Sequence, residues 1–300
     1  MQHVHTLLVR RLAPRIKEKM YSLPMPVVND GVVYDNIASA KHPPRQQILQ
    51  GIRAPVMAAC QNYSQLAPDV HLIGSLATSA AEKDALKHAY DVPTKPMNKL
   101  RNVLNQTIRS ARCAMCGVGE ATTLDHYLPK DDFPEFSVYS NNLTPSCAAC
   151  NTKKKKKIVD QNTQVRSFLH PYFDIVPNFQ FLGVEIRIDP TSFIVQFQIN
   201  RVAGMPAHVY NHLRSHVDEL GLLDRYRKST LNHLSDDRRA YARTFNEDGT
   251  GAILAAQLAN RANDYALDYG PNYWLAVLYT ELSSHNGFCH GGFQTLDAIQ

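Results

Sequence analysis

The chain has 300 residues, 44% of them hydrophobic and 20% charged, which is ordinary for a globular protein that folds in water. This length allows one large domain or two modest ones. No run of 18 or more apolar residues occurs, which excludes a transmembrane helix, and the N-terminal apolar run is too short for a signal peptide. We therefore expect a cytoplasmic protein that binds no membrane.

Helical signals dominate residues 1–110, which we take as a helical N-terminal region. Residues 1–20 show an amphipathic pattern with a leucine-rich stripe. Four prolines between positions 24 and 44 then predict loop with little regular structure. A helix is expected over residues 47–63, although Pro55 should kink or split it.

Two further helices are expected before the first cysteine pair. The sequence Ser79-Ala-Ala-Glu82 is a capping box, which predicts a helix from there to about Tyr90. The next helix, over residues 94–111, has a buried apolar stripe formed by Met97, Leu100, Leu104, Ile108 and Ala111. Three basic side chains lie outside this stripe: Lys99, Arg101 and Arg109. Because this helix leads directly into the cysteines, its basic face is placed to touch a substrate.

Four of the six cysteines form two Cys-x-x-Cys pairs, Cys113 with Cys116 and Cys147 with Cys150. Two such turns supply the four thiolates that a tetrahedral structural zinc ion needs. The stretch between the pairs is longer than the usual zinc-ribbon spacing, so it must hold structure of its own. The alternatives are two disulfides, which a reducing cytosol disfavours, or four cysteines that merely pack together. Two cysteines far from the pairs are expected to be small core residues: Cys60 and Cys289.

Polar residues between and after the pairs indicate a second metal site. Asp125 and His126 lie in ATTLDHYLP, which predicts a short strand running into a loop, and Asn151 follows the last cysteine in the first turn of a predicted helix. Asp and Asn oxygens are hard ligands that suit Mg²⁺ or Mn²⁺. A neutral imidazole is a good general base near pH 7. These parts suit hydrolysis of a phosphodiester, with His126 taking a proton from the attacking water.

The stretch from Cys113 to Lys157 resembles the HNH, or ββα-metal, endonuclease family. The matching pattern is a C-x-x-C pair, then LDHYLP, then an Asn before a second C-x-x-C pair, then CN and a lysine. In that family two strands and a helix carry the active site, and a zinc clamp lies outside it. The resemblance implies that His126 is the general base, and that Asp125 and Asn151 hold the catalytic divalent ion.

The family's middle position, which supports the loop carrying the base, falls on Asn142, with Asn141 as the alternative. The third residue of the family's His-Asn-His signature is Asn151 in this chain instead of His, and Asn is a common occupant of that position. We therefore expect a mainly α protein of the α+β class. An HNH core over residues 111–160 would lie between the helical N-terminal region and a hairpin-plus-helix region over residues 161–300.

Basic residues gather around this stretch. From Lys95 to Lys157 the sequence has eleven basic and five acidic residues, a difference of +6 that exceeds the net charge of +5 for the whole chain. A phosphate backbone is the natural partner of such a segment. Lysines 153–157 spread over every side of a helix, so only about two or three can face one strand of phosphates. The residues expected to contact nucleic acid, DNA in the first place, are Arg109, Lys130, Lys153 and Lys154.

The last 140 residues combine one hairpin with helices. Alternating apolar residues over 179–200 predict two strands joined by a turn, and helical patterns run from residue 206 almost to the end. His208, His212 and His216 recur every four residues, but no carboxylate lies between them in the metalloprotease manner. We interpret them as the polar side of a helix. His170, in an apolar segment, is expected to be a buried or turn histidine, with support of the site residues as the alternative.

The leading hypothesis is thus a Mg²⁺- or Mn²⁺-dependent endonuclease with a structural zinc ion. The first alternative is a zinc-stapled module that binds nucleic acid without cutting it. The second is a toxin-like effector restrained by a protein partner. Small HNH proteins of bacterial anti-phage defence systems, often paired with an ATPase subunit, are similar in size and layout. A homo-oligomer stays open, because double-strand cutting by one active site favours a dimer or successive nicks.

Overall fold

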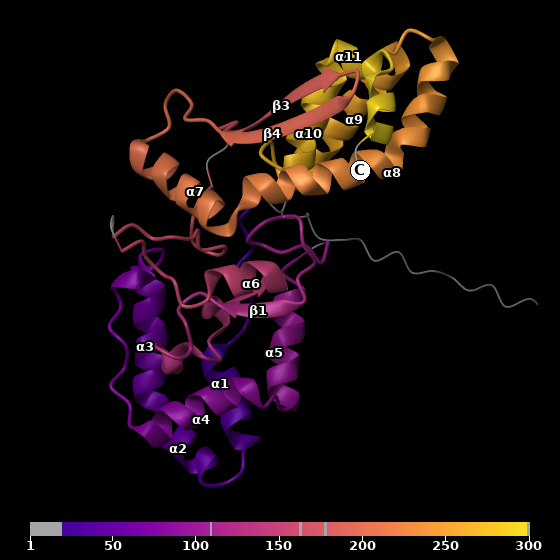
Figure 1. Ribbon diagram of the computed structural model, residues 1–300. Helices are drawn as coiled ribbons and strands as arrows, with labels where there is room; N and C mark the ends of the chain where they lie inside the picture. The colour runs from indigo at the N-terminus through magenta and orange to yellow at the C-terminus, as the bar shows by residue number, and fades with distance from the viewer. Residues whose placement is uncertain (1–19, 109, 162–163, 177–178, 299–300) are drawn as a thin grey trace, which may run out of the picture.

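The computed structural model describes residues 20–108, 110–161, 164–176 and 179–298. Two helical lobes lie one above the other, with a small two-stranded unit at the inner end of the N-terminal lobe (Figure 1). The expected class is confirmed, since the described chain is mainly helical and has two small antiparallel hairpins. No described helix is both long enough and apolar enough to cross a membrane.

The N-terminal lobe is built from α1 (Asp30–Ser39), α2 (Arg45–Gly51), α3 (Arg53–Leu66), α4 (Ala80–Asp91) and α5 (Lys95–Asn105). The sequence did not predict α1. It forms between the prolines because the Asn29 side chain accepts a hydrogen bond from the Val32 amide at 3.1 Å and so caps the helix. The amphipathic helix expected over residues 1–20 lies, up to residue 19, outside the described part of the chain.

Three other expectations for this lobe are met with shifted boundaries. The helix expected over residues 47–63 is split at Ile52, and Pro55 lies in the first turn of α3, where its missing N–H is not needed. The capping box of Ser79 and Glu82 begins α4 as expected. Helix α5 buries Met97, Leu100 and Leu104 of the expected stripe. It ends at Asn105, six residues early, so the expected stripe members Ile108 and Ala111 lie beyond it and Ala111 is exposed.

Strands β1 (Thr123–His126) and β2 (Leu143–Ser146) pair antiparallel, with Asp125 opposite Thr144. The connection between them contains two single 3-10 turns, η2 (Pro134–Phe136) and η3 (Ser140–Asn142). Helix α6 (Ala148–Lys154) follows β2 directly and packs on β1, and its N-cap is Cys147, whose sulfur accepts a hydrogen bond from the Cys150 amide. These elements form a ββα unit.

The C-terminal lobe packs a hairpin on helices. Strands β3 (Leu182–Asp189) and β4 (Ser192–Ile199) have the expected alternation, with Ile186, Phe193, Val195 and Phe197 buried. Five helices of the described chain follow: α7 (Ala207–Leu220), α8 (Leu222–Asp248), α9 (Ala252–Tyr269), α10 (Trp274–Ser284) and α11 (Asn286–Cys289). Residues 274–279 of α10 are all buried, so its apolar surface belongs to the core and not to a partner-binding face.

The two lobes share one hydrophobic core. A single cluster of buried side chains includes members from α1 through α10 and from the ββα unit. Polar contacts cross the same junction: the hydroxyls of Tyr21 and Tyr226 lie 2.6 Å apart, and the Met20 amide donates to the Tyr269 carbonyl at 2.9 Å. The ββα unit is therefore held from both sides.

Candidate functional site

The four paired cysteines converge at the junction of the lobes. Their sulfurs all lie within 4.8 Å of one another, and Cys116 Sγ is 3.9 Å from Cys147 Sγ. Sulfurs about 2.3 Å from a tetrahedral zinc ion are about 3.8 Å apart, so the group has the dimensions of a zinc site. All six cysteines are free and buried, and Cys60 and Cys289 lie outside the cluster, as expected.

Two residues outside the Cys-x-x-Cys pairs complete this cluster. The amide of Gly119 donates to Cys116 Sγ at 3.5 Å, and a Cβ on Gly119 would lie 2.8 Å from Cys147 Cβ, so only glycine fits there. Arg225, from α8, donates to the sulfurs of Cys150 at 3.0 Å, Cys116 at 3.4 Å and Cys147 at 3.5 Å. Four thiolates around Zn²⁺ carry a net charge of about −2, which this guanidinium offsets in part.

Hydrogen bonds among the four sulfurs shift the thiol pKa values in opposite directions. The pKa of Cys116 and Cys147 falls and that of Cys113 and Cys150 rises, and the charge of Arg225 lowers the pKa of Cys116 further. Sequence reasoning missed Arg225, because 75 residues separate it from Cys150 and no local pattern links the two. Only the packing of α8 against the cysteines brings them together.

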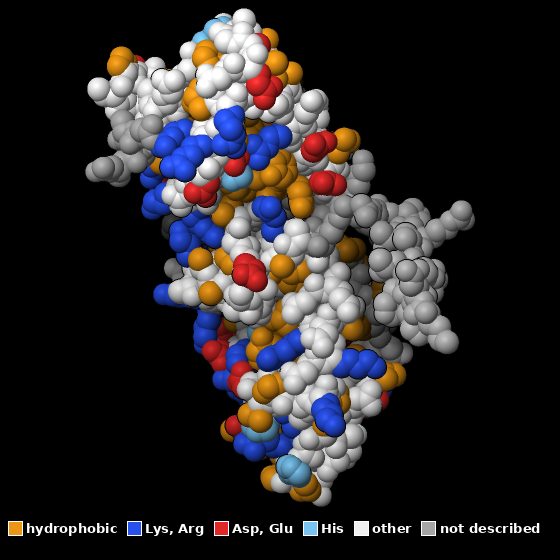
Figure 2. All heavy atoms as spheres, turned by 90° about the vertical axis from the view of Figure 1, so that its right-hand side faces the viewer, with side chains coloured by type: hydrophobic (Ala, Val, Ile, Leu, Met, Phe, Trp, Pro, Cys, Tyr) orange, Lys and Arg blue, Asp and Glu red, His pale blue; other side chains and the backbone are white. Residues whose placement is uncertain are grey.

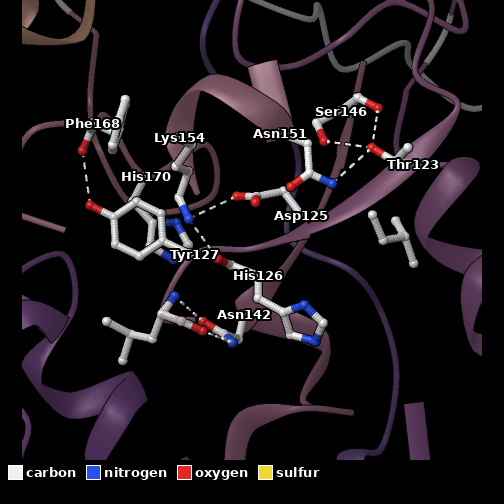
Figure 3. A network of polar contacts seen from close by, with 12 residues as sticks. Thr123, Asp125, His126, Tyr127, Asn142, Ser146, Asn151, Lys154, Phe168 and His170 are labelled. Atoms are coloured by element: carbon white, nitrogen blue, oxygen red, sulfur yellow. Dashed lines mark hydrogen bonds and ion pairs between the residues drawn. The ribbon is translucent and has the colours of Figure 1, made fainter. Parts of the chain in front are cut away.

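Asp125 and Asn151 lie on the same side of β1. Asn151 Nδ2 donates to Thr123 Oγ1 at 3.3 Å, and Thr123 and Asp125 are two residues apart on one strand and so share a face. In Figure 3 the carboxylate of Asp125 lies between Asn151 and Lys154. The amide nitrogen of Asn151 is used by Thr123, and its oxygen is the atom that would ligate a cation.

The Asp125 carboxylate has an oxygen that can accept a further hydrogen bond or bind a cation. Its Oδ2 lies 3.1 Å from Lys154 Nζ, yet this buried oxygen has no partner with hydrogen-bond geometry in the described structure. Burial raises the pKa of Asp125, and the charge of Lys154 lowers it in part. Hard oxygen donors of this kind fit Mg²⁺ or Mn²⁺, which usually keep several waters as further ligands.

Lys154 was expected to contact phosphate, and the structure corrects this expectation. Its side chain is only 1% exposed, and its Nζ donates to the His126 carbonyl at 2.7 Å besides pairing with Asp125. Lys154 lies three residues after Asn151 on α6, so the helix side that presents Asn151 to β1 also buries this lysine. The buried ammonium cannot reach a nucleic acid and acts as a counter-ion of Asp125.

The other three residues expected to contact phosphate differ in exposure and in their partners. Lys153 is exposed, as a phosphate contact must be. Lys130 forms an ion pair with Asp91 and lies 5.4 Å from the centre of the Tyr90 ring. Arg109 lies outside the described residues. Figure 2 shows Lys and Arg side chains in several groups along one face, separated by acidic and uncharged ones, so this face is not uniformly basic.

His126, the last residue of β1, points away from Asp125 and Asn151 (Figure 3). Its Nε2 lies 2.9 Å from the Ser137 carbonyl, and its ring meets the Tyr90 ring edge-on with the centres 4.4 Å apart. A carbonyl can only accept, so Nε2 carries the hydrogen. Burial lowers the pKa of His126 to about 4, so the ring is neutral at pH 7. The lone pair therefore resides on Nδ1, the nitrogen that can take a proton.

Asn142, and not Asn141, holds the loop that follows His126. Its Oδ1 accepts from the Leu128 amide at 2.8 Å and its Nδ2 donates to the Leu128 carbonyl at 3.0 Å. The Tyr63 hydroxyl also donates to Asn142 Oδ1, at 3.1 Å, and lies 2.9 Å from His170 Nε2. His170 is thus buried, as expected, but it belongs to the hydrogen-bond chain that fixes this loop.

A surface hollow of about 380 Å³ opens beside these groups. Thr123 and Asn151 line it from the Asp125 side of β1, whereas Leu124 and Tyr90 line it from the His126 side. Its remaining lining residues are Arg101, Asn105 and Thr122. The hollow is thus lined from both sides of the strand, although neither Asp125 nor His126 is among its lining residues. Tyr90, which lines it, is the ring against which His126 packs.

The three regularly spaced histidines of α7 differ in exposure to solvent. His208 is exposed, as expected for a polar helix side, and His212 Nε2 lies 3.0 Å from the Phe168 carbonyl. His216 is fully buried, which was not expected: its Nε2 lies 2.8 Å from the Met115 carbonyl, and its Nδ1 accepts from the Leu169 amide at 3.2 Å. These bonds fasten α7 to the ββα unit.

The buried His216 should make the protein sensitive to acid. Burial lowers its pKa from 6.5 to about 4, and the hydrogen bond to the Met115 carbonyl opposes this shift only in part. Between these values the unfolded chain binds a proton that the folded chain does not. The stabilisation is therefore complete above pH 6.5 and is lost as the pH falls towards 4, by about 3 kcal/mol for this one group. Urea unfolding across this range should show the loss, and His216→Ala should flatten the slope; an equal slope in the variant would contradict the assignment.

These observations define an α+β protein whose two helical lobes meet at a ββα unit with a cysteine cluster able to bind zinc. No protein-family profile matches the chain, and no solved structure matches it. A stretch of 239 residues is 28% identical to Protein ea31 of Escherichia phage lambda, and it covers 75% of this chain and 79% of that protein. This similarity extends far beyond the ββα unit and includes much of the lobes.

Proposed function

We propose that the protein is a metal-dependent HNH, or ββα-metal, endonuclease that hydrolyses phosphodiester bonds of nucleic acid, DNA in the first place. The observation that carries the proposal is the hollow that joins Asn151, on the Asp125 side of β1, to the Tyr90 ring that touches His126. Hydrolysis needs oxygen ligands for a cation, a base with a free lone pair, and room for a sugar-phosphate.

Each residue then has a defined task. Asp125 and Asn151 would hold Mg²⁺ or Mn²⁺, which would stabilise the charge on phosphorus and on the leaving oxygen. His126 takes a proton from water at Nδ1, while the Ser137 carbonyl holds the ring through Nε2. Asn142 keeps the loop after His126 in place. The cysteine cluster, with zinc, fixes the start of α6 and thereby the position of Asn151.

The direct test is incubation of the purified protein with supercoiled plasmid. We expect nicked and linear products when Mg²⁺ or Mn²⁺ is added and none without a divalent ion, because Asp125 and Asn151 alone cannot stabilise the developing charge. Gel electrophoresis over a time course measures the rate. Binding of the plasmid without any nicking in either metal would overturn the proposal.

A nucleic-acid-binding module without catalysis is the second candidate. It is favoured by Lys154, whose buried ammonium already neutralises Asp125 and opposes a second cation there. This candidate predicts gel shifts but no products in the plasmid assay. An effector restrained by a partner such as an ATPase subunit would instead be inactive alone and would co-purify with that subunit.

A further inference from the structure

Arg101 is the one cation that lines the hollow among the described residues. It lies on α5, and its guanidinium carbon is 4.9 Å from the centre of the Tyr90 ring. Its Nη2 donates to the Tyr90 carbonyl at 3.3 Å. Its Nε is buried and has no hydrogen-bond partner in the described structure. The side chain is thus held in position while part of its donor capacity is unused.

The lining of the hollow suits an anion. The described residues that form it include no carboxylate, and beside Arg101 they offer the amides of Asn105 and Asn151 and the hydroxyl of Thr122. The planar guanidinium matches the oxygens of a phosphate group better than an ammonium does.

Tyr90 links this cation to the imidazole. The same ring carries Arg101 within cation–π distance and meets the edge of His126. Its hydroxyl donates to the Leu124 carbonyl at 3.0 Å, which ties the ring to β1. A phosphate bound at Arg101 would therefore lie beside the same aromatic ring that His126 touches.

We propose that Arg101 and Asn105 form a binding site for a backbone phosphate of the nucleic acid, adjacent to the bond that is cut. The inference rests on the proposed function for its substrate class, but it concerns binding and is testable without cleavage. Tyr90 is a positioning residue in this site, since it holds Arg101 in place.

The test measures binding in a protein that cannot cut. His126→Ala, without added divalent metal, is titrated into a fluorescein-labelled DNA duplex, and anisotropy is followed over a series of salt concentrations. Adding Arg101→Gln should weaken binding about tenfold at low salt and lower the slope of log K against log[salt] by about 0.9, the value for one phosphate contact on duplex DNA. The affinity of the Arg101→Lys variant should lie between that of Arg101→Gln and that of the His126→Ala protein.

Arg187→Gln is the matched control, because Arg187 is an exposed arginine on β3 of the other lobe, and it should leave affinity and slope unchanged. Thermal melts show whether each variant is folded. Competition by inorganic phosphate at concentrations far below those that screen charge would show a free-phosphate site and would overturn the backbone assignment. Equal binding by Arg101→Gln, or no binding by any protein, would also overturn it. Binding that depends on Arg101 in a protein that never nicks plasmid would uphold this site and reject only the nuclease.

Discussion

Replacing Cys147 by serine is expected to release zinc and to unfold the centre of the protein. Cys147 is both a member of the sulfur cluster and the N-cap of α6. A serine hydroxyl can still cap the helix, so the substitution tests the loss of the metal ligand. Zinc binding contributes on the order of 10 kcal/mol to the folding of small zinc-dependent units. We therefore expect the free energy of unfolding to fall by several kcal/mol. Elemental analysis of the purified protein and thermal circular dichroism measure the two effects.

The matched control is Cys289→Ser. Cys289 is a buried cysteine outside the cluster, and its thiol donates to the Leu282 carbonyl at 3.3 Å, a bond that a hydroxyl can keep. This variant should retain zinc and melt close to the unchanged protein. If Cys147→Ser instead kept one zinc ion per chain and an unchanged melting temperature, the cluster would not be the clamp of this fold.

Replacing His126 by alanine should reduce plasmid cleavage about 10²–10⁴-fold, the usual contribution of a general base. The change removes the only imidazole that touches the Tyr90 ring in the described structure, together with its bond to Ser137. The His126 backbone carbonyl still accepts from Lys154, so we expect α6 to stay in place. The measurement is the initial nicking rate in Mg²⁺ and in Mn²⁺.

His208→Ala serves as the control, since His208 is an exposed histidine of α7 and should have no effect on the rate. Binding of DNA by His126→Ala should match that of the unchanged protein, which separates a catalytic loss from a binding loss. Cleavage by His126→Ala at the unchanged rate would remove the imidazole from the mechanism, even if the plasmid assay itself succeeded.

Local patterns in the sequence carried much of this architecture. The Cys-x-x-Cys pairs, the capping box before α4 and the two alternating strands of the second hairpin are each encoded within a few residues, and all appear where expected. Such features depend on short-range geometry: a tight turn brings two thiols together, and strand alternation separates buried from exposed side chains. The positions of Asp125, His126 and Asn151 on a strand and a helix belong to this class.

Tertiary packing decided the rest. Lys153 and Lys154 are neighbours of the same residue type, yet Lys153 is exposed and Lys154 is the buried partner of Asp125. The orientation of α6 about its own axis, where it packs on β1, decides which lysine faces inward. Arg225 reaches the cysteines, and Tyr90 joins Arg101 to His126, only because α8 and α4 pack against the ββα unit. These contacts join residues far apart in the chain, and no pattern within a single turn or strand encodes them.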